Sequence, residues 1–228
     1  NFRLRNPTSR LPWQVSFARA LTEDAVDIVH FLQQHGSILV RHKTIVTTVH
    51  DIASSNEYPP FYESPYWALM SRYIKTIRSL LLRKSTTIIA VSNATKKQVV
   101  QELGRRVPIY VISEATNLSE YLKFDRARFS RPYFLAMTDF SPRKNILGTL
   151  RTYASLPKKF LKTYDLRIVL SMEYQKNNIE KELHRLEISP FVKFHDRPSD
   201  AELASLYTHA TLFFYLSLYE GFGLPILE

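Results

Sequence analysis

The sequence predicts an α/β protein made of two doubly wound domains, each a parallel sheet with helices on its faces. Short runs of β-branched and apolar residues alternate with longer segments of helical period, which is typical of βα units. This alternation stops in a polar stretch near 115–131 and then starts again. We therefore expect a first domain over residues 1–125 and a second over 126–228.

In the first half, the expected strands are short apolar runs at residues 27–31, 44–49, 86–91 and 109–112. Residues 66–84 have helical period, with an apolar face centred on Ile77. After the third strand, Ser92 is a candidate N-cap for a helix over 93–103, which Gly104 would end.

The second half repeats the pattern. Strands are expected at residues 130–137, 166–170, 191–194 and 211–216, and helices at 144–156, 177–188 and 199–210. Ser199 and Glu202 have the spacing of a capping box at the start of the last of these helices.

Composition limits the kind of protein. The chain has 228 residues and no cysteine, which excludes disulfides and cysteine metal sites and favours a reducing cytoplasm. Six of the histidines show no metal-ligand spacing and are interpreted as structural: His30, His35, His42, His184, His195 and His209. No apolar run approaches the roughly 18–20 residues that span a bilayer.

The net charge of +10 favours an anionic partner such as a nucleotide, a membrane surface or a nucleic acid. No nucleic-acid-binding motif is present, so we expect no nucleic acid partner. Arg72, Lys75, Arg78 and Arg83 are expected to crowd opposite the apolar face of the helix near 70–84. This basic face is either simply solvated or a contact for an anionic membrane surface.

The closing stretch YEGFGLPILE has the composition of a phosphate-binding turn. Gly221 and Gly223 allow close approach of a ligand to the backbone, and Pro225 suits the first turn of a helix. Backbone N–H groups at that helix start would face a phosphate. Glu220 and Glu228 would accept hydrogen bonds from sugar hydroxyls. The alternative is an ordinary strand-to-helix turn with two solvated acids.

The same stretch resembles the E-x7-E region of the retaining GT-B glycosyltransferases called glycosyl transferases group 1. Four other stretches resemble family motifs in the same order: TVHDI, IIAVSNATKKQVV, SPRKNILGTLRTYASL and VKFHDRPSDAELASLYTHATLFFYLS. The resemblance covers roughly residues 27–228. It implies the GT-B fold, two Rossmann-like domains facing across a cleft, and a chain that lacks family segments at both ends.

The resemblance implies catalytic roles for five residues. Arg143 and Lys144 would neutralise the nucleotide diphosphate and the charge that grows on it during bond breaking. Glu220 would hold the donor sugar, His50 would contact the sugar or phosphate, and Asp51 would orient His50 or the acceptor. The alternatives are a solvated basic turn for the cations and a satisfied loop histidine for His50.

The resemblance also implies donor contacts for Thr138, Asn145, Gly221, Phe222, Gly223, Leu224 and Glu228, with Glu228 on the ribose hydroxyls. Ser92 is an N-cap unless an acceptor phosphate uses that helix end. The chain departs from the family, which carries glycine near Thr138, Ala115 and Asp196 and proline near Leu216. A threonine side chain at position 138 would crowd the donor.

We therefore expect a transferase that moves a sugar from a UDP-, GDP- or dTDP-linked donor to a sugar or lipid-linked acceptor with retention. It would need neither a metal nor another cofactor, and would act in cell-surface polysaccharide or glycolipid synthesis. We expect it in the cytoplasm, or peripherally on the inner face of the membrane. The alternative is a degenerate, non-catalytic GT-B relative that binds a sugar nucleotide or a protein partner.

Overall fold

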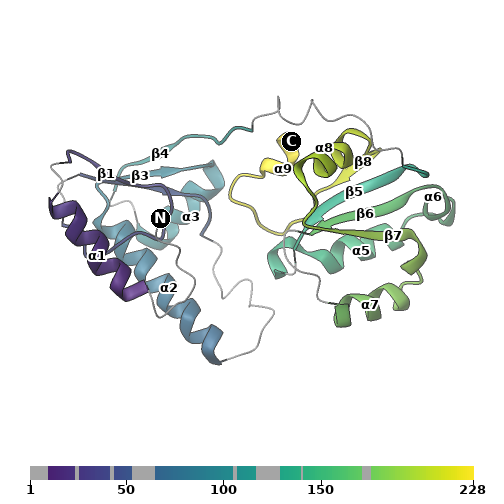
Figure 1. The fold of residues 1–228 in the computed structure, drawn as a ribbon, viewed down its shortest axis with the longest axis horizontal. Helices are drawn as coiled ribbons and strands as arrows, with labels where there is room; N and C mark the ends of the chain where they lie inside the picture. The colour runs from purple at the N-terminus through teal and green to yellow at the C-terminus, as the bar shows by residue number, and fades with distance from the viewer. Residues whose placement is uncertain are drawn as a thin grey trace. The chain divides into compact units, whose positions relative to one another are not determined.

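The structure is a computed structural model that describes residues 10–23, 26–41, 44–52, 65–104, 107–116, 129–139, 141–170 and 176–228. These residues divide into two compact units, the first ending at Glu114 and the second beginning at Ala115 (Figure 1). The predicted boundary at 125/126 lies outside the described residues. Among the described residues, each unit contains one four-stranded parallel sheet.

The first unit contains α1 (Arg10–Glu23), β1 (Val29–Phe31), β2 (Ile45–Val49), α2 (Pro65–Lys84), β3 (Thr87–Ala90), α3 (Asn93–Leu103) and β4 (Ile109–Val111). Its strands lie in chain order, β1-β2-β3-β4, and every neighbouring pair is parallel. The predicted strands and helices of this half are confirmed. The sequence does not predict α1, because RLPWQVSFARALTE has no clear apolar stripe.

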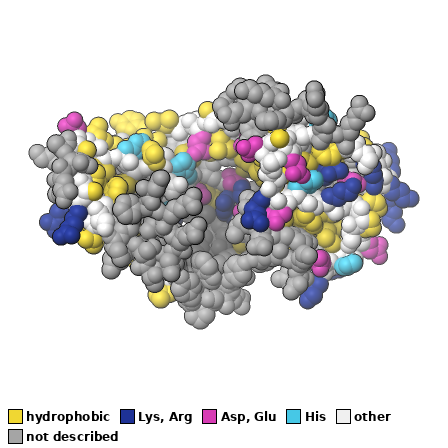
Figure 2. Space-filling model, viewed as in Figure 1, with side chains coloured by type: hydrophobic (Ala, Val, Ile, Leu, Met, Phe, Trp, Pro, Cys, Tyr) yellow, Lys and Arg dark blue, Asp and Glu magenta, His cyan; other side chains and the backbone are white. Residues whose placement is uncertain are grey.

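The core of the first unit lies on one face of its sheet. Alternate strand residues, including Val49 and Ile88, pack there against α2 and α3, while Phe31 packs against α1 (Figure 1). On the other face, large hydrophobic side chains are exposed over the strands: Ile28, Leu32, Tyr110 and Ile112 (Figure 2). Parallel sheets are normally covered on both faces. The described residues therefore cover only one face of this sheet with helices.

The second unit contains β5 (Tyr133–Thr138), η2 (Pro142–Lys144), α5 (Ile146–Ala154), α6 (Lys158–Thr163), β6 (Asp165–Leu170), α7 (Lys176–Arg185), η3 (Ser189–Phe191), β7 (Val192–Asp196), α8 (Asp200–Thr208), β8 (Leu212–Phe214) and α9 (Leu224–Leu227). Helices α5 and α7 pack on one face of its sheet and α8 on the other, as a doubly wound domain requires (Figure 1). Every strand predicted for this half is confirmed.

The strand order of the second unit, β7-β6-β5-β8, creates a topological switch point. The chain runs from β5 to β6 and β7 on one side and then returns to β8 on the other side of β5. The loops that leave β5 and β8 therefore diverge, and such divergence opens a crevice at the carboxyl ends of the strands. Ligand-binding residues in this unit are expected on those two loops.

Local sequence signals account for several helix ends. The Ser92 and Ser199 side chains each accept a hydrogen bond from the backbone N–H three residues later, so both predicted N-caps are confirmed. The carboxylate of Glu202 contacts Nδ1 of His195 at 2.8 Å, so this acid links α8 to β7 instead of completing the capping box. Gly104 ends α3 with a φ of 70°.

The prediction for Arg78 is wrong. Its residue is 6% exposed, and Nη2 donates to Oε2 of Glu102 on α3 at 2.9 Å. Arg78 therefore lies on the buried side of α2, where that helix meets α3. Arg72, Lys75 and Arg83 are exposed as expected. No described helix is both long enough and apolar enough to cross a membrane.

Candidate functional site

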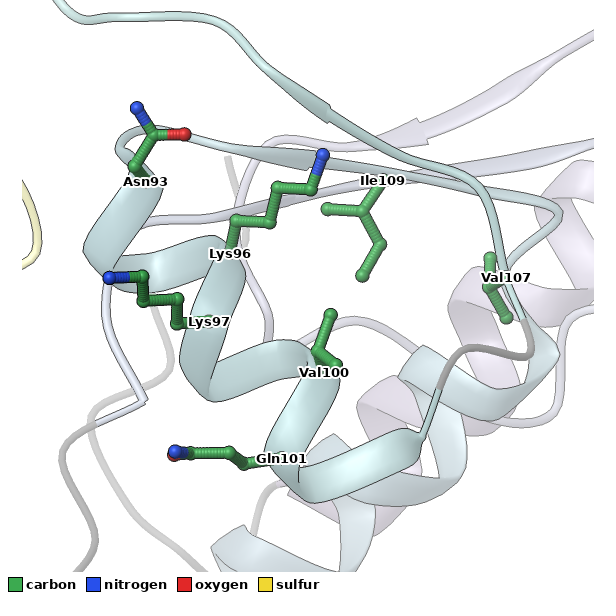
Figure 3. A pocket seen from close by; sticks show the side chains of 7 residues that line it. All are labelled: Asn93, Lys96, Lys97, Val100, Gln101, Val107 and Ile109. Atoms are coloured by element: carbon green, nitrogen blue, oxygen red, sulfur yellow. The ribbon is translucent and has the colours of Figure 1, made fainter.

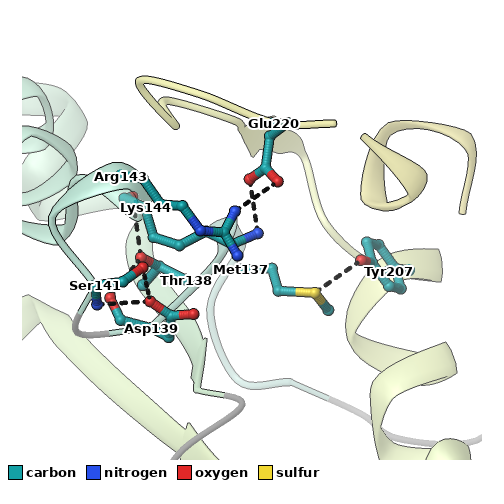
Figure 4. A network of polar contacts seen from close by, with 8 residues as sticks. All are labelled: Met137, Thr138, Asp139, Ser141, Arg143, Lys144, Tyr207 and Glu220. Atoms are coloured by element: carbon teal, nitrogen blue, oxygen red, sulfur yellow. Dashed lines mark hydrogen bonds and ion pairs between the residues drawn. The ribbon is translucent and has the colours of Figure 1, made fainter. Parts of the chain in front are cut away.

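The loop that leaves β5 is held in a tight turn. The Asp139 carboxylate accepts a hydrogen bond from the backbone N–H of Ser141 at 2.6 Å and a second from its hydroxyl (Figure 4). This turn leads directly into η2, which carries Arg143 and Lys144. The two cations predicted to face a diphosphate therefore stand on a constrained loop at the switch point.

Asn145 joins this loop to the segment that follows β8. Its backbone is left-handed, with φ 55° and ψ 44°, a conformation that asparagine tolerates better than most residues. Its Oδ1 caps α5 by accepting from the N–H of Gly148, and its Nδ2 donates to the carbonyl of Leu216 at 2.9 Å. The backbone N–H of Leu218 donates to the carbonyl of Arg143 at 2.7 Å. These bonds fasten the two diverging loops together.

Both cations pair with Glu220, which lies on the segment after β8. Nη1 of Arg143 lies 3.1 Å from Oε2 of Glu220, and Nζ of Lys144 lies 2.6 Å from Oε1 (Figure 4). The three side chains are only 26%, 15% and 18% exposed. Charge-assisted hydrogen bonds are stronger than neutral ones, and here they order both loops.

The environment keeps Glu220 ionised. Burial raises the pKa of this carboxyl, but hydrogen bonds from Lys144 and Ser217 and the charges of Lys144 and Arg143 outweigh it. The net result is a pKa below the ordinary value. At neutral pH this group of three side chains therefore holds two cations and one carboxylate, a net charge of about +1.

The second glutamate, Glu228, is held by α8. The Tyr207 hydroxyl donates to Oε2 of Glu228 at 3.0 Å and also lies 3.7 Å from the sulfur of Met137 on β5. Figure 4 shows the Tyr207 hydroxyl directed towards the sulfur of Met137. No pattern in the sequence singles out Tyr207, because an aromatic residue on a helix is expected to pack.

The two glycines of the closing stretch differ. Gly223 has a φ of 98°, a left-handed conformation that favours glycine, and it precedes α9 with Pro225 in the first turn as predicted. Gly221 is buried but does not have a positive φ. Backbone freedom is therefore required at Gly223 alone, while Gly221, Phe222 and Leu224 complete the turn.

The side chain of Thr138 is turned into the loop. The residue is 2% exposed, and the single proton of its hydroxyl is shared between the backbone carbonyls of Lys144 at 3.1 Å and Asp139 at 3.2 Å. It therefore braces the loop that carries the cations and does not project into open space, where it would crowd a donor.

The remaining predicted residues lie in the first unit, at the carboxyl ends of its strands. Nδ1 of His50 lies 2.5 Å from the Glu114 carboxylate, and Nε2 lies 2.9 Å from the Leu32 carbonyl. Both are acceptors, so both contacts form hydrogen bonds only when both ring nitrogens carry a proton. His50 thus has protein partners at both nitrogens. The Asp51 carbonyl accepts from the side chain of Gln34 at 2.9 Å.

Glu114 and Gln34 were not predicted as site residues from the sequence. Each follows a strand directly or closely, as His50 and Ser92 do, and the carboxyl ends of parallel strands meet at one edge. A search for polar residues just after each strand would have found them. Ser92 itself is the N-cap of α3, as the structural alternative predicted.

An open groove of about 910 Å³ lies between α3 and β4 (Figure 3). Val100, Val107 and Ile109 form its apolar part, while Lys96 and Lys97 stand at its side. It contains none of the predicted site residues, so we do not assign the donor to it. In the part of the chain that the structure describes, no cluster of three or more His, Asp or Glu residues could hold a metal ion.

Comparison with known proteins shows the family to which this chain belongs. Residues 1–120 match the model of Glycosyltransferase Family 4, and residues 120–228 match that of Glycosyl transferases group 1. The chain belongs to glycosyltransferase family 4. The group 1 match covers the cation loop and both glutamates, so the resemblance noted in the sequence is confirmed.

The chain is 26% identical over 200 residues to O-antigen chain mannosyltransferase B of Escherichia coli, covering 82% of this chain and 51% of that protein. Sucrose-phosphate synthase from Thermosynechococcus elongatus has a similar structure, with a TM-score of 0.74, 17% identity, and coverage of 99% of this chain and 59% of that one. HepE of Anabaena, solved with UDP-glucose, has a TM-score of 0.67, 16% identity, and coverage of 95% and 60%. The structural likeness supports the GT-B fold, and the chain spans about half the length of the relatives it matches.

Proposed function

We propose that this chain carries the donor-binding part of a glycosyltransferase that moves a sugar from a nucleoside diphosphate to an acceptor with retention. The observation that carries the proposal is the group formed by Arg143, Lys144 and Glu220 at the switch point. Two cations fixed on one loop match the charge of a diphosphate. The same group faces the segment that carries the second glutamate, Glu228.

The ion pairs suggest how the donor would enter. In the free protein Glu220 neutralises part of the charge of Arg143 and Lys144. Diphosphate oxygens would compete for the same N–H donors and release the carboxylate towards the sugar. As the bond from the sugar to the diphosphate breaks, negative charge grows on the leaving group, and the two fixed cations stabilise it. The proposal needs no metal ion for this step.

The donor sugar is proposed to be mannose and the product part of a cell-surface polysaccharide. The support is the similarity to an O-antigen chain mannosyltransferase. The test is to incubate the full-length protein with UDP-, GDP- and dTDP-linked sugars, mannose included, and to measure release of the nucleoside diphosphate. The anomeric configuration of the product, measured by NMR, tests retention. Binding without release would favour the non-catalytic alternative.

The two glutamates should affect binding differently. Glu228→Gln should weaken binding of the bare nucleoside diphosphate, because we assign Glu228 to the ribose. Glu220→Gln should leave that binding unchanged or tighter, because it releases Arg143 and Lys144 from a competing carboxylate, and should weaken the sugar nucleotide relative to the bare diphosphate. Calorimetry with both ligands measures this, and the reverse order would refute the assignment.

We also propose that the exposed cations of α2 hold the protein at an anionic membrane surface. Arg72, Lys75 and Arg83 are exposed, and each contributes about 1 kcal/mol near such a surface. We expect cosedimentation with vesicles rich in anionic lipid but not with neutral vesicles, and release by moderate salt. The triple variant R72E/K75E/R83E should lose this binding.

A matched control reverses three cations elsewhere. K158E/K159E/K162E changes the net charge equally on the exposed surface of α6 in the second unit. If both triple variants lose vesicle binding to the same extent, net charge alone causes it and the assignment to α2 fails. Sedimentation of the parent protein with neutral vesicles would also refute the proposal.

A further inference from the structure

A buried tyrosine hydroxyl beside the candidate site forms no hydrogen bond with the residues that the structure describes. Tyr215 follows β8 directly, and its Oη is inaccessible to water and has no hydrogen-bonding partner among the described residues. Leaving a polar group buried and unsatisfied is unfavourable, by about 1–3 kcal/mol in typical cases. A buried unpaired hydroxyl therefore raises the question of whether its partner arrives in another state.

The position of the hydroxyl is fixed on two sides. The Tyr215 ring stacks on Phe213, with centroids 5.9 Å apart and an interplanar angle of 27°. A Cβ placed on Gly223 would lie 3.3 Å from the hydroxyl oxygen, so the hydroxyl abuts the glycine turn. Phe213 in turn packs against Tyr207, which holds Glu228. The ring therefore has little freedom to seek another partner.

Among the neighbouring charged groups, the Glu220 carboxylate has the largest effect on the Tyr215 hydroxyl. Burial raises the pKa of the Tyr215 hydroxyl far above its ordinary value, and the proximity of Glu220 raises it further. The hydroxyl is thus a permanent donor at neutral pH. Glu220 acts on this pKa both through its charge and as a neighbouring hydrogen-bond acceptor, but the pair does not meet the geometry of a formed hydrogen bond, and the carboxylate accepts from Arg143 and Lys144 instead.

We propose that Tyr215 is a positioning residue: its hydroxyl donates a hydrogen bond to the Glu220 carboxylate when an anionic ligand binds Arg143 and Lys144 in place of that carboxylate. The exchange rests on the proposed function, since a diphosphate is the anion expected at these cations. Removing both partners from a partly buried carboxylate is strongly unfavourable unless another donor replaces them. Tyr215 supplies that donor without any movement of the backbone and fixes the carboxylate for its contact with the sugar.

The first test needs no ligand. Methionine at both cation positions, R143M/K144M, deprives Glu220 of the same partners that a diphosphate would capture. Tyr215→Phe should change the melting temperature of the parent protein by less than about 1 °C, because the hydroxyl has no bond to lose. In the R143M/K144M background the same substitution should lower it by about 2–4 °C. Equal effects in both backgrounds would overturn the proposal.

The second test uses UDP, GDP and dTDP as probes in calorimetry, with turnover of the matching sugar nucleotide measured in parallel. For the tightest probe, Tyr215→Phe should weaken binding about tenfold, as expected for a lost hydrogen bond to a charged group. In the Glu220→Gln background this effect should fall below about twofold. Tyr110→Phe, on the exposed face of the first sheet, is the control and should change nothing.

The outcomes separate this inference from the proposed function. A larger loss of stability from Tyr215→Phe in the R143M/K144M background than in the parent protein supports the exchange of partners even if no probe binds, in which case the proposed function fails alone. Nucleotide binding and turnover that Tyr215→Phe leaves at parental values would overturn the inference and leave the proposed function standing. An undiminished loss in the Glu220→Gln background would show that Tyr215 acts on the ligand directly, which also overturns it.

Discussion

Turnover of the sugar nucleotide should fall by roughly 10²–10³-fold in each of the single variants Arg143→Ala and Lys144→Ala, the range typical of losing one preorganised charge-stabilising group. Both cations stand on the braced loop after β5, and both contact the carboxylate at the switch point. Their charge is therefore fixed before the leaving group develops its own. Donor binding should weaken as well. Steady-state release of nucleoside diphosphate and calorimetry measure the two effects.

A matched control is Arg151→Ala. Arg151 lies on α5 in the same unit and pairs with Glu182, but its side chain is 58% exposed and belongs to no candidate site. We expect parental turnover from it. Near-parental rates in both the Arg143 and Lys144 variants would exclude these cations from the site, whereas equal losses in all three variants would indicate a general effect of charge on stability.

The sequence predicts most of the fold because its signals are local. Buried strands such as β5 and β6 are continuous apolar runs, and the N-caps Ser92 and Ser199 act within one helical turn. Helix α1 was not predicted, because its sequence has no apolar stripe at helical spacing. Only its packing against Phe31 and the neighbouring side chains reveals which side of the helix is buried.

The candidate site was predictable in its residues but not in its bonds. The motifs locate Arg143, Lys144 and Glu220, yet their pairing spans more than seventy positions and follows from the strand order of the second sheet. The same is true of Tyr207 and Glu114, whose roles depend on which elements lie beside them. A short sequence pattern contains no information about such contacts.

Arg78 shows how a helical pattern misleads when the buried face is polar. A periodicity argument assigns charged residues to the solvent side, because buried charges are rare unless they are paired. The partner, Glu102, lies on another helix, and its identity cannot be inferred from the period of α2. The error changes the experiment on the membrane, since a reversal of Arg78 would act on folding.

Arg78→Met should destabilise the protein by about 3–5 kcal/mol, because it leaves the Glu102 carboxylate buried without its counter-ion. The side chains are 8% and 15% exposed, so water cannot readily replace the lost contact. Chemical denaturation followed by circular dichroism measures the change. Leu80→Met is a suitable control on the same helix, since that side chain is 44% exposed and should tolerate the substitution.

The double variant R78M/E102M decides whether the pair itself is stabilising. Among the residues that the structure describes, Nε of Arg78 and Oε1 of Glu102 have no hydrogen-bonding partner, so the pair compensates only part of the cost of removing two charges from water. Replacing both by apolar side chains should therefore restore most of the stability lost in Arg78→Met, as is common for incompletely satisfied buried pairs. A double variant as unstable as the single one would mean that the arginine contributes mainly through packing of its alkyl chain. A stable Arg78→Met variant would contradict its burial against α3 and would return Arg78 to the exposed basic face, where its reversal would again be an informative test of membrane binding.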